Sequence, residues 1–224
     1  PDSKGIRNID LETIEDALQR RMVLYDRASD QHHDTISAFI KSVRGSSPDA
    51  ALYWLGRMIE AGEDPMFIAR RLVILAAEDI GLAEPMALPM AVAAQQAVHF
   101  IGMPEGAIPL AEATVYLATS PKSNSAYAAL NQALEDARRT TNEPVPMHLR
   151  NPVTPLMKDL DYGKGYKYSH DYPGHFAPME NLPPSLTERR YYQPSDQGYE
   201  KVVSQRLREW WTGRKGDAQG KAND

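Results

Sequence analysis

The chain has 224 residues, a net charge of −5 and no cysteine. This length can bury a sizeable core in one large domain or two modest ones, and the lack of cysteine excludes disulfides and thiolate metal sites. No run of 18 apolar residues occurs and the first residues are polar, so the sequence indicates neither a membrane span nor a secretory signal, and we expect a cytoplasmic protein.

Charge and aromatic content both change along the chain near residue 140. Residues 1–137 carry 11 Lys and Arg against 19 Asp and Glu, whereas residues 138–215 carry 13 against 9. The second stretch also holds ten of the 18 aromatic side chains. The sequence therefore predicts an acidic first part and a basic, aromatic second part.

The first part has the pattern of consecutive helices. Apolar residues recur at three- and four-residue spacing from Leu11 to Met22 and again from Ile36 to Val43. Prolines then follow at intervals of 17 to 20 residues, each at or near the start of a further helical pattern, where a missing N–H costs least. They are Pro48, Pro65, Pro85, Pro104 and Pro121. Connections this short predict a compact bundle of five to seven helices.

Two features of these helices bear on function. Alanine-rich stretches such as Ala91–Ala94 suit close helix packing, either in the core of one chain or at a subunit interface. In the helix after Pro121, apolar residues recur at helical spacing and form a stripe. The stripe consists of Tyr127, Leu130, Leu134 and Ala137.

The second part is irregular. Its prolines leave room for a short helix around Thr154 to Leu160, and residues 161–196 are predicted to be mostly loop, with room for a strand or two. A last helix is expected from Ser195 or Asp196, and the tail from Gly213 onward has no apolar anchor. The inward residues expected on that helix are Val202, Val203, Leu207 and Trp210 or Trp211.

No catalytic or nucleotide-binding motif is present. Gly163-Lys164 lacks the first glycine, the following Ser or Thr and the preceding strand of a phosphate-binding Walker A loop. The pairs His170 with His175 and His32 with His33 have no third ligand within a metal-binding spacing. We therefore predict no catalytic, cofactor-binding or metal-binding residue in this chain.

One hypothesis is that the basic half binds single-stranded nucleic acid, because basic side chains hold phosphates and aromatic rings stack on bases. The alternative is that the tyrosines of these long loops pack on their own domain. The DNA-binding candidates are Lys164, Lys167, Arg189, Arg190, Tyr166, Tyr168, Tyr191 and Tyr192.

Several long strings resemble one protein family. They are "HDTISAFIKSVRGSSPDAALYWLGRMIEAGEDPMFIARRLVILAAEDIGLAEP", "YLATSPKSNSAYAALNQALEDAR", "VPMHLRNPVTPLMKDLDYGKGYKYSHDYPGHF" and "RRYYQPSDQGYE". Together they are similar to the region that follows the ATPase core in the replication-associated recombination protein A family, also called MgsA. These are bacterial AAA+ proteins related to the Werner-helicase-interacting protein. Val153 and Pro155 depart from the family's usual residues in the short helix.

The resemblance implies an all-α fold: a clamp-loader-collar-like helical bundle with an irregular, aromatic-rich C-terminal subdomain. It implies the end of an AAA+ lid in residues 1–28, a helical oligomerisation domain in 29–138, an MgsA-type subdomain in 139–213 and a flexible tail in 214–224. The Walker motifs, and with them ATP and Mg, would belong to a preceding core, so this fragment is not expected to be an enzyme by itself.

The resemblance also implies a role and partners. The chain would tie the subunits of a DNA-dependent AAA+ ATPase into a homo-oligomer, a tetramer, acting in DNA replication, repair and recombination beside single-strand-binding protein and recombinase. Two classes stay open: an assembly module, or a module that contacts single-stranded or forked DNA through the basic, aromatic half. No membrane partner is expected.

Four basic residues beside apolar helix stripes are candidates for facing a partner, and the alternative for each is an ordinary solvated helix surface. They are Lys41, Arg44, Arg70 and Arg71.

Overall fold

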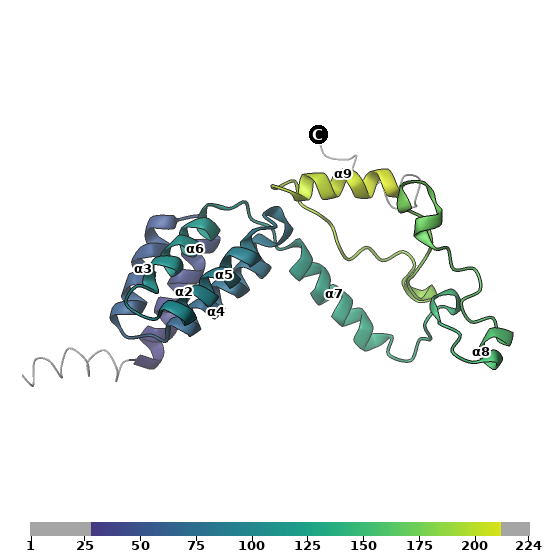
Figure 1. The fold of residues 1–224 in the computed structure, drawn as a ribbon, viewed down its shortest axis with the longest axis horizontal. Helices are drawn as coiled ribbons and strands as arrows, with labels where there is room; N and C mark the ends of the chain where they lie inside the picture. Colours follow the sequence, from purple (N-terminus) through teal and green to yellow (C-terminus); the bar gives the residue numbers. More distant parts are fainter. Residues whose placement is uncertain (1–27, 212–224) are drawn as a thin grey trace, which may run out of the picture. The chain divides into compact units, whose positions relative to one another are not determined.

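A computed structural model describes residues 28–211 of the chain (Figure 1). The expected helix at 11–22, the lid segment up to residue 27 and the predicted tail lie outside these residues. The all-α prediction is confirmed, since the described residues form helices and turns. The strand or two expected within 161–196 are wrong: this segment contains isolated helical turns and no strand, and its prolines and glycines interrupt any ladder.

Within the described residues, five α-helices belong to the first compact unit, which ends at Lys122. They are α2 (Ala28–Arg44), α3 (Pro48–Glu60), α4 (Pro65–Leu75), α5 (Ala87–Ile101) and α6 (Ala107–Thr119). Helix α6 packs against each of the other four, so it lies at the centre of the bundle (Figure 1). The predicted bundle of short-linked helices is present.

Local sequence signals start and stop these helices. Helices α3 and α4 begin at the predicted prolines, and the Asp64 carboxylate accepts hydrogen bonds from the backbone N–H groups of Met66 (2.9 Å) and Phe67 (3.1 Å). Gly62 and Gly102 follow α3 and α5 with φ of 77° and 76°, a left-handed backbone that glycine adopts without a Cβ clash. The turns are therefore encoded locally.

The core of this first unit is apolar and closely packed. Large side chains from every helix but α5 are buried within it, and α5 contributes alanines and Val98. The largest include Phe39, Ile68, Leu72, Leu110 and Leu117. Burying each such side chain contributes about 1.5–3 kcal/mol, so this cluster supplies most of the unit's stability.

The second compact unit starts at Ser123. It contains α7 (Ser125–Arg139), α8 (Pro155–Asp159) and α9 (Glu200–Trp210), joined by long connections with single helical turns (Figure 1). The short predicted helix is α8, and Thr154 caps it by accepting from the N–H of Met157. The predicted 29–138 domain spans the division between units, because α7 is fastened to the chain that follows it.

The predicted helix after Pro121 is present as α7, and its apolar stripe is exposed within the described residues. Tyr127, Leu130 and Leu134 are 46 %, 56 % and 44 % exposed, and the buried residues of this helix are Ala129 and Asp136. The helix is held by polar contacts on its other face, so its periodicity does not reveal which face is covered within the chain.

The last helix also differs from the prediction. Helix α9 begins at Glu200 instead of Ser195 or Asp196, since a turn through Gly198 (φ 48°) precedes it. Val203 and Leu207 are half-buried, whereas Val202 and Trp210 are exposed.

Candidate interaction surfaces

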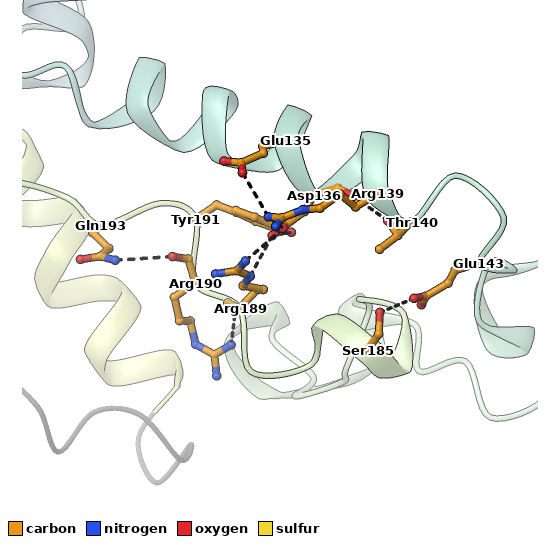
Figure 2. A network of polar contacts seen from close by, with 10 residues as sticks. All are labelled: Glu135, Asp136, Arg139, Thr140, Glu143, Ser185, Arg189, Arg190, Tyr191 and Gln193. Atoms are coloured by element: carbon orange, nitrogen blue, oxygen red, sulfur yellow. Dashed lines mark hydrogen bonds and ion pairs between the residues drawn. The ribbon is translucent and has the colours of Figure 1, made fainter.

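Asp136 near the end of α7 gathers three of the basic and aromatic side chains of the second unit (Figure 2). Arg189 Nε lies 2.8 Å from Asp136 Oδ2, and the Tyr191 hydroxyl donates to the same oxygen at 3.1 Å. Arg139 donates to Oδ1 at 2.7 Å. Burial alone would raise the pKa of Asp136, but the hydrogen bonds from Arg189, Tyr191 and Arg139 lower it.

A second buried carboxylate lies at the start of α9. Glu200 has no exposed surface and accepts hydrogen bonds from the Ser123 hydroxyl (2.7 Å), the Ser125 hydroxyl, the Tyr192 hydroxyl (2.9 Å) and the backbone N–H of Ser195 (2.7 Å). Burial opposes ionisation, yet the hydrogen bonds from Ser125, Ser195 and Ser123 lower the pKa of Glu200 to about 2.

These two carboxylates fasten one segment along α7. Residues 189–200, which we call the strap, contact the C-terminal end of α7 through Asp136 and the residues at its N-terminal end through Glu200. The strap therefore runs antiparallel to the helix, as the chain trace within this unit shows (Figure 1). The strap is the string "RRYYQPSDQGYE", and these residues hold the chain against α7.

The eight DNA-binding candidates fall into two groups along the chain, and the two groups have different contacts. Three of them, Arg189, Tyr191 and Tyr192, are engaged by the two carboxylates. Arg190 donates to the backbone carbonyls of Thr187 and Arg189. The remaining four lie in residues 164–168, apart from the strap in sequence.

Residues 164–168 form an exposed aromatic and basic loop. Tyr166 and Tyr168 are exposed, and the Tyr168 ring lies 5.1 Å from that of His170. Lys164 forms an exposed ion pair with Asp161 at 3.1 Å. The Lys167 Nζ lies 3.5 Å from the carbonyl oxygen of Pro178, which is a long hydrogen bond. An exposed ion pair contributes little, so both lysines remain available to a ligand.

The histidines do not gather into a metal site. The rings of His170 and His175 lie 5.0 Å apart, but no group of three or more His, Asp or Glu side chains within residues 28–211 could hold a metal ion. Within the same residues, no helix is long and apolar enough to cross a bilayer.

The four partner-facing candidates have different surroundings. Lys41 is exposed, whereas Arg44 is held by Asp79, with Nε 2.5 Å from Oδ1, and by Glu78 at 3.6 Å. Arg70 pairs with Asp64 at 3.2 Å and lies over the ring of Phe67. The Nε of Arg71 is buried and has no hydrogen-bond partner among the described residues. The half-exposed Arg44 side chain thus links α2 to the buried Asp79 in the π-helical turn at Ala76–Ile80.

Sequence reasoning missed the exposed face of α5 and α6. Helix α5 contains no Asp, Glu, Lys or Arg, and α6 contains only Glu112. Phe100 is 90 % exposed and Ile108 is 69 % exposed. Other exposed apolar residues of this pair and its turn are Leu88, Val92, Ile101, Met103 and Val115. The signal that identifies the face is the lack of charge over a whole helix.

Sequence reasoning also missed both carboxylates. Asp136 and Glu200 stand among other acidic residues in charged helices, and nothing local marks either as buried. Asp136 is 53 residues from its partner Arg189 along the chain, and Glu200 is 77 residues from its partner Ser123.

Comparison with known proteins places the chain among AAA+ ATPase C-terminal regions. A family model described as "MgsA AAA+ ATPase C terminal" matches residues 45–211, and one described as "AAA C-terminal domain" matches residues 1–44. The chain is 50 % identical over 199 residues to an uncharacterised AAA domain-containing protein of Mycobacterium tuberculosis, covering 89 % of this chain and 44 % of that protein.

Two further relatives carry functional names. Identity is 44 % over 207 residues to replication-associated recombination protein A of Escherichia coli, covering 92 % of this chain and 46 % of the relative. The chain is 49 % identical over 156 residues to the ATPase WRNIP1 of Dictyostelium discoideum, and the match covers 68 % of this chain and 18 % of the relative. The chain therefore spans less than half the length of these relatives.

Proposed function

This chain belongs to the MgsA AAA+ ATPase C-terminal family, and from that premise we propose that it is the assembly module that ties the subunits of a longer AAA+ ATPase into a homo-oligomer. The observation that carries the proposal is the group of exposed apolar side chains on α5 and α6, two helices whose only Asp, Glu, Lys or Arg is Glu112. The longer protein would bind ATP and Mg in its preceding core. The names of its relatives support a role in replication-associated recombination.

The chemistry of the α5–α6 face suits contact between subunits. Helix α5 has exposed apolar side chains and no charged residue, and covering exposed apolar surface of this kind is favourable in water. Interface cores are depleted in charged residues and enriched in Phe and Met, which matches Phe100 and Met103. An apolar face of this kind is an interaction site or an aggregation hazard. A second copy of the chain is the partner that is always present at matching concentration.

The solution mass across a dilution series tests this proposal. We expect a stable oligomer, a tetramer, whose mass does not change when forked DNA is added. Phe100→Glu places a charge on the face and should lower the mass of the oligomer. The matched control Tyr53→Glu, at an exposed aromatic residue of α3, should leave that mass unchanged. A monomer at every concentration, or an unchanged mass in Phe100→Glu, would contradict the proposed face.

A second candidate function, contact with single-stranded DNA, is favoured by the exposed loop at 164–168. Two exposed tyrosines beside two lysines suit stacking on bases and pairing with phosphates. The strap residues Arg189, Tyr191 and Tyr192 are held by Asp136 and Glu200, so the loop at 164–168 is the part of the candidate set that this proposal uses.

Fluorescence anisotropy with a labelled oligothymidine tests the DNA candidate. Affinity should fall as salt rises, since lysine contacts release counterions. The double change Tyr166→Ala and Tyr168→Ala should weaken binding, because stacking is worth about 1–3 kcal/mol per base, while Lys41→Ala in the first unit should not. Binding that the double change leaves intact would move the DNA site elsewhere.

A further inference from the structure

Aromatic side chains from two segments that are distant in the sequence come together in the second unit. The ring centres of Tyr168 and His170 lie 5.1 Å apart, and those of His170 and His175 lie 5.0 Å apart. Phe176, the next residue along the chain, contacts Trp210 and Trp211 at the end of α9 (Figure 1). We call these six residues the ring series. They are Tyr168, His170, His175, Phe176, Trp210 and Trp211.

Phe176 joins the two segments with well-formed ring contacts. Its ring is within 10° of parallel to that of Trp210 at 5.7 Å, and it meets the ring of Trp211 edge-on at 5.1 Å. Both are favoured arrangements of aromatic pairs. Just before Phe176, Gly174 and His175 have φ of 67° and 54°, and a histidine keeps this left-handed backbone where surrounding contacts hold it. Residues 168–176 are thus fastened to α9.

The ring series is a surface and not a core within the described residues. Tyr168 is 55 % exposed and Trp210 is 42 % exposed. His170 and His175 are exposed as well, and only Phe176 and Trp211 are half-buried. Aromatic surface that is held in place and left in water is typical of a binding site. The series therefore presents fixed rings to a ligand.

The charges around the ring series are mainly basic. Arg206 lies over Trp210, with Cζ 5.9 Å from the ring centre, which is a cation–π distance. The exposed charged residues of 161–176 and of α9 are Lys164, Lys167, Lys201, Arg206 and Arg208 against Asp161, Asp171 and Glu209. Rings beside an excess of positive charge suit a single-stranded nucleic acid, whose bases stack and whose phosphates pair with cations. An acidic peptide would satisfy the basic side chains but would offer few flat groups to the rings.

We propose that the ring series is a stacking surface for single-stranded DNA, along which the strand passes from Tyr168 to Trp210 while Arg206 contacts a phosphate. The inference rests on the second candidate function, DNA contact at the 164–168 loop. It extends that site to α9, a helix that holds none of the DNA-binding candidates identified from the sequence.

Tryptophan fluorescence of the full chain tests the proposal without disturbing the ring series. The chain has three tryptophans, and Trp54→Phe, in the first unit, leaves Trp210 and Trp211 as reporters. Oligothymidine should quench their emission, whereas an abasic oligonucleotide of equal length and charge should not. Equal quenching by both, or no quenching by an oligothymidine that anisotropy shows to be bound, overturns the ring series and leaves the 164–168 loop standing. No binding at all overturns both.

Substitutions in α9 separate stacking from simple packing. Trp210→Leu keeps an apolar side chain beside Phe176 but removes the ring, and should weaken oligothymidine binding roughly five- to 150-fold, as for one lost base stack. Trp210→Phe should restore most of this loss, and Val202→Ala, at an exposed residue of the same helix, is the control. Equal affinity of the Leu and Phe variants overturns the proposal.

The phosphate contact has its own readout. Arg206→Gln should lower the slope of log affinity against log salt by about 0.7, the value for one phosphate contact to a single strand. An unchanged slope removes Arg206 from the site and contradicts the proposed path of the strand.

Discussion

The two units of this chain are stabilised in different ways. The first unit buries large apolar side chains such as Phe39, Ile68 and Leu110 between five helices. The described part of the second unit buries two alanines and two carboxylates, and its long connections are held by hydrogen bonds to Asp136 and Glu200. Hydrophobic packing is the main stabilising contribution in the first unit, whereas the described part of the second is held mainly by hydrogen bonds to two buried carboxylates.

The largest expected effect is on the core of the first unit. Phe39→Ala removes a ring with no exposed surface and should lower the free energy of unfolding by about 3–5 kcal/mol, through lost burial and a cavity. Chemical denaturation measures this change. Val153→Ala, at an exposed residue of the second unit, is the control and should change the free energy by no more than about 0.5 kcal/mol.

The next largest effect is on the strap. Glu200→Gln leaves hydroxyl donors facing an amide that accepts fewer bonds, and should destabilise the second unit by about 1–3 kcal/mol. Hydrogen exchange should show lost protection in residues 189–200 and in α7, with α2–α6 unaffected. Glu188→Gln, at an exposed site, serves as the control. Equal loss of protection in both units would mean that they unfold together.

Acid should loosen the second unit in a defined range. The pKa of Glu200 is lowered from its ordinary 4.5 to about 2 in the folded chain, and that of Asp136 is lowered as well. A lowered pKa contributes stability that is fully present above the unfolded value and is lost as the pH falls from about 4.5 towards 2. NMR signals of Tyr191 and Tyr192 should report release of the strap there. Release that begins near neutral pH would contradict the assigned hydrogen bonds.

The smallest effect is expected at the exposed loop. Lys164→Ala removes an ion pair with Asp161 in which both side chains are largely exposed, so it should change stability by at most about 1 kcal/mol. Thermal unfolding measures this change. A larger loss would show that the loop is packed against another part of the assembled protein.

Much of the first unit could be predicted from the sequence because its signals are local. Pro48 and Pro65 start helices, Asp64 caps one, and Gly62 and Gly102 end others, each within a few residues of the element concerned. The resemblance to the family of replication-associated recombination protein A, read from long strings, is confirmed by comparison with known proteins. Of the candidate sites, the basic and aromatic residues of the 164–168 loop and the alanine-rich character of α5 could be noticed in advance.

The stripe of α7 shows why the rest could not be predicted. Periodicity identifies an apolar face but not whether that face is covered by the same chain. The face with Tyr127 and Leu130 looks like a core face, yet the covered side of the helix is the one with Asp136. The choice is made by Arg189 and Tyr191, more than 50 residues further along.

By itself, the sequence determined the family, the all-α class and the order and limits of most helices, because proline, glycine and apolar spacing act over a few residues. Only the tertiary structure decided which basic and aromatic residues are engaged and which apolar faces stay exposed. Burial of Glu200 and Asp136 depends in part on donors brought from distant segments, Ser123 and Ser125 for Glu200 and Arg189 and Tyr191 for Asp136, and the sequence near each carboxylate does not reveal these donors.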